Sequence, residues 1–165
     1  MTSAPEAIRF PYVEVPESAQ ALRREVRTFL AEERAAGSFE PACDCWADFS
    51  EAMSKKLGAR GWLGMTWPKV HGGQERSLIE RWVVTEELLA AGAPVGAHWI
   101  ADRQSGPQIL RYGTDEQRRF FLPQIARGEC YFAIGMSEPG AGSDLSSART
   151  VGEKVEGGWK ITGQK

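Results

Sequence analysis

The sequence is poor in the residues that build disulfide frameworks and metal sites. It has three cysteines and two histidines in 165 residues. Cys43 and Cys45 lie too close together to close a useful loop, and a Cys-x-Cys pair without a second pair is a weak zinc signal. We therefore expect no disulfide framework and no bound metal, and a reducing cytoplasm is the simplest compartment.

Long apolar runs and an excess of one charge are also missing. No run approaches the roughly 20 apolar residues that cross a bilayer, and the N-terminal stretch lacks the basic start and apolar core of a secretory signal. The 20 Lys and Arg residues balance 22 Asp and Glu residues, and neither side of Gly128 is basic. The sequence therefore predicts neither a membrane protein nor a nucleic-acid-binding protein.

The sequence does contain enough apolar material for a folded core. Hydrophobic residues make up 42% of the chain and charged residues 25%, which is ordinary for a globular protein. Residues 1–16 carry three prolines and are predicted to form an extended lead-in, and residues 17–128 a helical domain. Its first helix begins at Glu17, where apolar residues start to recur at spacings of three and four. These residues are Leu22, Val26, Phe29 and Leu30.

Two further helices are predicted between Asp44 and the helical segments that start at residue 94. One begins near Asp44 and ends around Gly58–Gly61. The residues that we expect it to bury are Trp46, Phe49, Met53 and Leu57. The next begins with a capping box of Ser77 and Glu80, and apolar residues around much of its circumference predict deep burial. These residues are Leu78, Ile79, Trp82, Val83, Leu88 and Leu89.

The helical pattern continues to Gly128. Residues 94–112 predict one or two helical segments that Gly106–Pro107 interrupts. A second capping box, Thr114 with Gln117, begins the last helix of the domain. We expect Pro123 to bend that helix before it ends at Gly128.

After Gly128 the composition changes toward β structure. Residues 130–137, CYFAIGMS, are short, apolar and aromatic, and predict a buried strand. Residues 138–144 predict a loop, and residues 150–158 and 159–162 predict two strands that meet at Gly157–Gly158. The predicted fold class is α+β: an all-helical bundle, then residues 129–165 as the first strands of an incomplete β-barrel domain, because so few strands cannot close a barrel.

The segment MSEPGAGSD, residues 136–144, is the main candidate for a binding site. A strand would deliver the Ser137 hydroxyl, Ser143 adds a second hydroxyl, and Gly140 and Gly142 can take backbone angles that other residues avoid. Backbone amides and small hydroxyls suit anionic or carbonyl oxygens, such as those of a phosphate or a flavin. The alternative is an ordinary glycine-rich turn. Leu145 stands where a dinucleotide fingerprint needs its third glycine, and no Gly-x-Ser-x-Gly elbow occurs.

Several segments together resemble the acyl-CoA dehydrogenase family. The family carries T/S-E-P-x-A/G-G-S-D, which residues 137–144 match, followed by a hairpin that ends in N/T-G-Q-K, which residues 162–165 match. Residues 61–73, GWLGMTWPKVHGG, and 111–129, RYGTDEQRRFFLPQIARGE, resemble the segments that precede this motif. The resemblance extends from about Glu17 to the last residue.

The resemblance implies an FAD-dependent enzyme that oxidises an acyl-CoA thioester to its 2-enoyl product and passes electrons to an electron-transfer flavoprotein, as a homo- or hetero-oligomer. It implies that FAD is bound by the following residues: Ile134, Gly135, Met136, Ser137, Gly142 and Ser143. Ser143 would also lie near the phosphates of acyl-CoA. The family's general base is a glutamate that would follow Lys165, so no catalytic residue is expected within these 165 residues.

Other readings of the sequence stay open. The same fold serves acyl-CoA oxidases and flavin-dependent monooxygenases, and it also serves as a non-catalytic partner subunit in a heteromeric dehydrogenase. Glu138 and Asp144 are expected to be structural or turn residues rather than proton carriers. Trp82, Trp99 and Ile100 are expected to pack in the core more readily than to line an acyl pocket.

Overall fold

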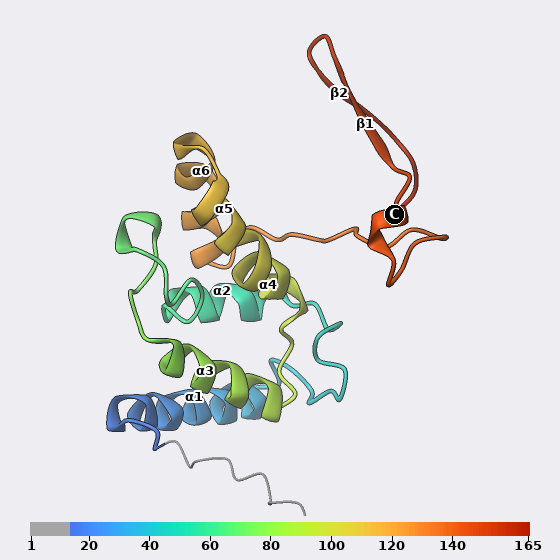
Figure 1. The fold of residues 1–165 in the computed structure, drawn as a ribbon. Coiled ribbons are helices and arrows are strands. Elements are labelled where there is room, and N and C mark those ends of the chain that lie inside the picture. The colour runs from blue at the N-terminus through green and yellow to red at the C-terminus, as the bar shows by residue number, and fades with distance from the viewer. Residues whose placement is uncertain (1–13) are drawn as a thin grey trace, which may run out of the picture. The chain divides into compact units, whose positions relative to one another are not determined.

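A computed structural model describes residues 14–165 as two units, which divide between Tyr131 and Phe132 (Figure 1). The first unit is helical, and the second contains a hairpin. The helices are α1 (Glu17–Ala35), α2 (Glu51–Ala59), α3 (Leu78–Ala90), α4 (Gly96–Ile100), α5 (Gly106–Tyr112) and α6 (Asp115–Ala126). None of the described helices is long and apolar enough to span a bilayer.

Helices α1 and α3 lie side by side and are joined by a buried carboxylate (Figure 1). The Glu87 side chain is 8% exposed and accepts hydrogen bonds from Arg23 Nη1 at 2.6 Å and Arg27 Nε at 2.7 Å. Burial by itself would raise the pKa of Glu87, but the hydrogen bonds from both arginines outweigh burial and lower it. Removing either arginine would leave a buried charge only partly compensated.

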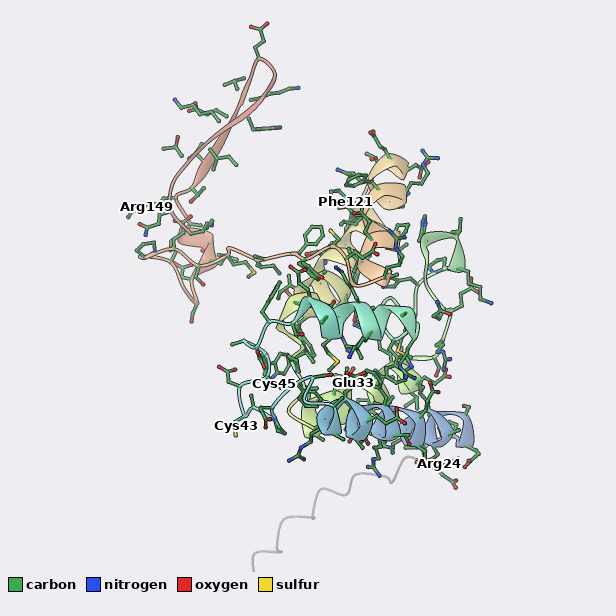
Figure 2. All side chains as sticks on the ribbon, turned by 180° about the vertical axis from the view of Figure 1, so that it is seen from behind. Arg24, Glu33, Cys43, Cys45, Phe121 and Arg149 are labelled. Atoms are coloured by element: carbon green, nitrogen blue, oxygen red, sulfur yellow. The ribbon has the colours of Figure 1, made fainter. Side chains whose placement is uncertain are left out.

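The apolar stripe of α1 is buried as predicted. Leu22, Val26, Phe29 and Leu30 are each at most 5% exposed, and Phe29 packs edge-on against Trp62 with ring centroids 5.2 Å apart. Helix α2 closes the other side of this core with Met53 and Leu57. Lys56 of α2 also pairs with Glu33 of α1, which Figure 2 labels.

The start of the second helix was predicted too early. Helix α2 begins at Glu51, because Ser50 is its N-cap and accepts a hydrogen bond from the Met53 amide at 3.2 Å. The chain before it forms a turn. Trp46 and Phe49, which we expected to be buried on this helix, are therefore 49% and 57% exposed.

Helix α3 is less buried than its composition predicts. Its capping box of Ser77 and Glu80 is confirmed. Val83, Val84 and Leu88 are buried, but Leu78 is 71% exposed and Trp82 is 46% exposed. The apolar residues surround the helix, whereas the core of this unit contacts one face of it. The prediction of deep burial all round was therefore wrong.

Residues 96–112 form a nearly continuous helical stretch in which a π-helical turn, Ala101–Ser105, separates α4 from α5. Asp102 in this turn is buried, and its carboxylate accepts a hydrogen bond from the Gly64 amide at 2.7 Å. Burial also lowers the pKa of His98 in α4 to about 4, so the imidazole is neutral at pH 7. The predicted Thr114–Gln117 capping box begins α6, which continues as one helix through Pro123.

Two glycines let α2 pack backbone to backbone against the end of α6. A Cβ added at Gly58 would lie 2.3 Å from the carbonyl oxygen of Arg127. A Cβ added at Gly128 would lie 2.2 Å from the carbonyl oxygen of Ser54. Gly128 also has a φ of 70°, which disfavours other residues. The contact therefore requires glycine on both sides.

We predict that Gly58→Ala destabilises the chain although alanine normally favours a helix. Overpacking against a backbone carbonyl should lower the free energy of unfolding by about 1–3 kcal/mol, measured by urea denaturation. Gly142→Ala is the control, because a Cβ there has no neighbour within 4 Å and φ is not positive. A Gly58→Ala variant as stable as the original chain would contradict the backbone contact.

In the second unit, β1 (Val151–Val155) and β2 (Gly158–Thr162) form an antiparallel hairpin. Val155 pairs with Gly158, so the turn is Glu156–Gly157, one residue earlier than predicted, and Gly157 supplies a φ of 80°. All ten strand residues are exposed.

The predicted strand over residues 130–137 does not form. These residues have no regular secondary structure, and residues 133–137 are exposed. A strand needs a neighbour for its backbone hydrogen bonds, and the one sheet of the described residues pairs β1 only with β2. The apolar composition of this segment indicated burial, but the described residues provide neither a strand nor a core to receive it.

Candidate functional site

The candidate loop is closed by a tight turn of its own backbone. The Glu138 amide donates to the Ala141 carbonyl at 2.9 Å, and the Ala141 amide donates back to the Glu138 carbonyl at 3.0 Å. Pro139 and Gly140 form the turn between them, as their residue types favour. Ala141 is 3% exposed, whereas the rest of the turn is open to solvent or half-buried.

The carboxylate of Glu138 ties this turn to two later parts of the chain. It accepts hydrogen bonds from the Arg149 amide at 2.6 Å and the Thr150 amide at 2.9 Å, just before β1. It also forms an ion pair with Lys165 Nζ at 3.0 Å, and its side chain is 8% exposed. We call these four residues, Glu138, Arg149, Thr150 and Lys165, the Glu138 clamp.

The clamp makes Glu138 unsuitable as a proton acceptor. The hydrogen bond from the Arg149 amide, followed by those from Thr150 and Lys165, lowers the pKa of Glu138 to about 2. Such a carboxylate is ionised at pH 7 and already has its donors in place. A general base needs a pKa closer to the working pH. The geometry thus agrees with the structural role expected for Glu138.

Lys165 makes a second contact, to the residue that precedes Ser137. Its Nζ donates to the carbonyl oxygen of Met136 at 3.0 Å. A Cβ added at Gly135 would lie 3.0 Å from Lys165 Cβ, so the chain passes close to the lysine stem there. Gly163 also approaches closely, because a Cβ on it would lie 2.2 Å from Thr150 Oγ1. The loop, the entry to β1 and the end of the hairpin therefore meet.

Asp144 is a turn residue. Its carboxylate accepts a hydrogen bond from the Ser146 hydroxyl, and its backbone carbonyl accepts one from the Ser147 hydroxyl at 2.9 Å. The hydrogen bond from the Ser146 hydroxyl to this carboxylate is the main cause that lowers the pKa of Asp144. These contacts begin a short 3₁₀ turn, Leu145–Ser147.

The residues proposed to bind FAD form an exposed surface beside the clamp. Six residues are exposed: Ile134, Gly135, Met136, Ser137, Gly142 and Ser143. The hydroxyls of Ser137 and Ser143 have no hydrogen-bond partner within the described residues. A hollow of about 330 Å³ lies next to them. Its lining consists of Glu138, Pro139, Gly140, Ser147, Arg149, Thr150, Gly163 and Gln164; Figure 2 labels Arg149.

We expected Gly140 and Gly142 to take backbone angles that other residues avoid, and this expectation was wrong. Neither Gly140 nor Gly142 has a positive φ, and a Cβ on either would meet no atom within 4 Å. The positive φ angles of this unit are at Gly157 and Gly163. Within the described residues, neither backbone angle nor a close neighbour requires glycine at 140 or 142. The sequence reading also missed Arg149, Thr150 and Lys165, whose partner lies more than ten residues away along the chain.

The predicted absence of a metal site rested on few histidines and cysteines. Cys43 is exposed, and Cys45 is buried. Burial raises the pKa of the Cys45 thiol. Within residues 14–165, no three side chains of the His, Cys, Asp or Glu type converge as metal ligands.

Comparison with known proteins decides the family. Residues 16–129, most of the chain, match the family "Acyl-CoA dehydrogenase, N-terminal domain". The chain belongs to the acyl-CoA dehydrogenase family. The helical unit, with its side-by-side α1 and α3, is therefore the N-terminal helical domain of that family, and the resemblance seen in the sequence is confirmed.

The relatives of this chain include heteromeric complexes. The chain is 40% identical to acyl-CoA dehydrogenase FadE26 of Mycobacterium tuberculosis over 152 residues, 88% of this chain and 37% of that protein. A structure of the ChsE4–ChsE5 complex from the same organism superposes with a TM-score of 0.75 at 38% identity, covering 94% of this chain and 39% of that one. The structure of the steroid acyl-CoA dehydrogenase Tcur3481–Tcur3483 superposes with a TM-score of 0.75 at 36% identity. The match covers 90% of this chain and 38% of that one. The chain thus spans less than two fifths of the length of each of these relatives.

We predict that the Glu138 carboxyl titrates far below its ordinary pKa of 4.5. Because folding lowers its pKa, the contribution of the clamp to stability is complete above pH 4.5 and is lost as the pH falls toward 2. In a ¹⁵N-labelled chain, the amide shifts of Arg149 and Thr150 should therefore change with a midpoint near pH 2. Glu138→Gln should abolish this step. A midpoint near pH 4.5 would show that the clamp does not form.

Proposed function

We propose that this member of the acyl-CoA dehydrogenase family binds FAD at residues 134–143 and takes part in the α,β-dehydrogenation of an acyl-CoA thioester. Members of the family depend on FAD. The observation that carries the proposal is the pair of exposed Ser137 and Ser143 hydroxyls, which lack a partner within the described residues and lie on a loop held by the Glu138 clamp. Hydroxyls held in this way are available to a ligand's oxygens and ring nitrogens.

FAD, when bound, would supply the acceptor for the hydride, and the chain would supply binding and orientation. The Ser137 hydroxyl would hydrogen-bond the edge of the flavin ring. The Ser143 hydroxyl would bind the phosphates of FAD or of acyl-CoA. Gly140 and Gly142 would keep the loop free of side chains where the ligand approaches, which fits the empty space around both. The proposed general base, a glutamate, would follow Lys165, and an electron-transfer flavoprotein would accept the electrons.

We further propose that the protein assembles with a second subunit of the same family. The support is the heteromeric nature of two of its relatives, ChsE4–ChsE5 and Tcur3481–Tcur3483. A steroid acyl-CoA ester is then the first substrate class to try, because the second of these is a steroid acyl-CoA dehydrogenase. Co-expression with a neighbouring family member, followed by size-exclusion chromatography with light scattering, tests the assembly. An active homo-oligomer would overturn it.

Our first functional prediction concerns Ser137 in the full-length protein. A neutral hydrogen bond contributes about 0.5–1.5 kcal/mol net, so Ser137→Ala should raise the Kd for FAD about two- to tenfold and change the flavin absorption spectrum. Ser18→Ala, at an exposed position of α1, is the matched control. Equal FAD affinity and identical spectra in all three proteins would contradict the proposed site.

The second prediction separates dehydrogenase from oxidase and from a non-catalytic subunit. A dehydrogenase should bleach its flavin with acyl-CoA under anaerobic conditions and reoxidise slowly in air, since the reduced flavin passes electrons to another protein. The 165-residue chain alone should reduce no dye acceptor, because the base is expected outside it. Rapid reoxidation of the flavin by oxygen would favour an oxidase or monooxygenase. A flavin that acyl-CoA does not bleach would favour a non-catalytic subunit. Dye reduction by the chain alone would place the catalytic groups within residues 1–165.

A further inference from the structure

The residues on both sides of Ser137 are held by the same lysine. Lys165 Nζ lies 3.0 Å from the Met136 carbonyl oxygen and 3.0 Å from the Glu138 carboxylate. The Glu138 carboxylate in turn is fixed by the Arg149 and Thr150 amides. Ser137 lies between these two anchored residues, but its own hydroxyl has no partner within the described residues.

We propose that Lys165 and Glu138 are positioning residues for the Ser137 hydroxyl, an inference that rests on the proposed function of Ser137 in FAD binding. Lys165 holds the Met136 carbonyl before Ser137 and the Glu138 carboxylate after it. The backbone on both sides of Ser137 is therefore fixed in position. A hydroxyl whose backbone is fixed in advance loses little entropy when it binds a ligand. Lys165 thus acts on FAD through Ser137.

Charge explains why a cationic side chain is needed there. The Glu138 carboxylate is 8% exposed, and two backbone amides compensate only part of its charge. The ammonium group supplies the opposite charge and has three N–H donors, enough for both acceptors. Its removal would leave the Met136 carbonyl without this donor and the carboxylate without its counter-ion.

The path of the chain at Gly135 supports the same assignment. A Cβ at Gly135 would lie 3.0 Å from Lys165 Cβ, closer than ordinary van der Waals contact allows. The backbone before Met136 therefore runs directly along the stem of Lys165. The lysine holds this stretch both by its aliphatic part and by its ammonium group, which is how lysine commonly packs.

The test uses the full-length protein loaded with FAD and compares Lys165→Met with Lys160→Met. Lys160 is an exposed lysine on β2, so its loss controls for the removal of one charge. Loss of a charge-assisted hydrogen bond should raise the Kd for FAD about tenfold in Lys165→Met and shift the flavin absorption spectrum. Lys160→Met should stay within about twofold of the original. Lys165→Arg, which keeps the charge and the donors, should restore most of the affinity.

A double variant shows whether Lys165 acts through Ser137. If it does, Ser137→Ala should weaken FAD binding much less in the Lys165→Met background than in the original protein. Additive effects, or a Lys165→Met variant that matches Lys160→Met in affinity and spectrum, would overturn the inference while leaving FAD binding by Ser137 intact. If Lys165→Met fails to fold, Lys165→Gln, which keeps a donor for Met136, undergoes the same comparison. An original protein that binds no FAD would overturn the proposed function itself.

Discussion

One carboxylate, that of Glu138, joins three separate parts of residues 132–165. Of the described residues in this unit, Ala141 alone is a buried hydrophobic residue, and every residue of the hairpin is exposed. Apolar burial therefore contributes little to the order of the unit. Its order depends on the carboxylate of Glu138, which joins the loop, the entry to β1 and Lys165 through hydrogen bonds and one ion pair. The candidate loop is attached to the rest of this unit through that group and Lys165.

The helical unit is stabilised in a different way. It has a continuous apolar core, and the buried carboxylate of Glu87 joins two helices that lie side by side. Between α2 and the end of α6, glycines at 58 and 128 allow backbone to touch backbone. Loss of one polar contact here removes part of the stability, whereas loss of Glu138 in the other unit removes its central attachment.

The sequence predicted best what neighbouring residues determine. The capping boxes at Ser77 and Thr114 and the apolar stripe of α1 lie within a few turns of helix, and all were confirmed. The predicted strand over residues 130–137 was wrong because strand formation depends on a partner elsewhere in the chain. The candidate loop could be located from its motif, but the Glu138 clamp could not, because it depends on contacts between residues far apart in the sequence.

The hairpin also matters for how this stretch of chain behaves in isolation. Val151 and Val155 of β1 and Trp159 and Ile161 of β2 present between 45% and 73% of their surface to solvent. In the one sheet of the described residues, each strand has a single neighbour, so both outer rows of backbone N–H and C=O groups are unpaired. A ribbon with open edges and apolar side chains is a template for intermolecular strand pairing. A ribbon left uncovered in this way is therefore prone to self-association.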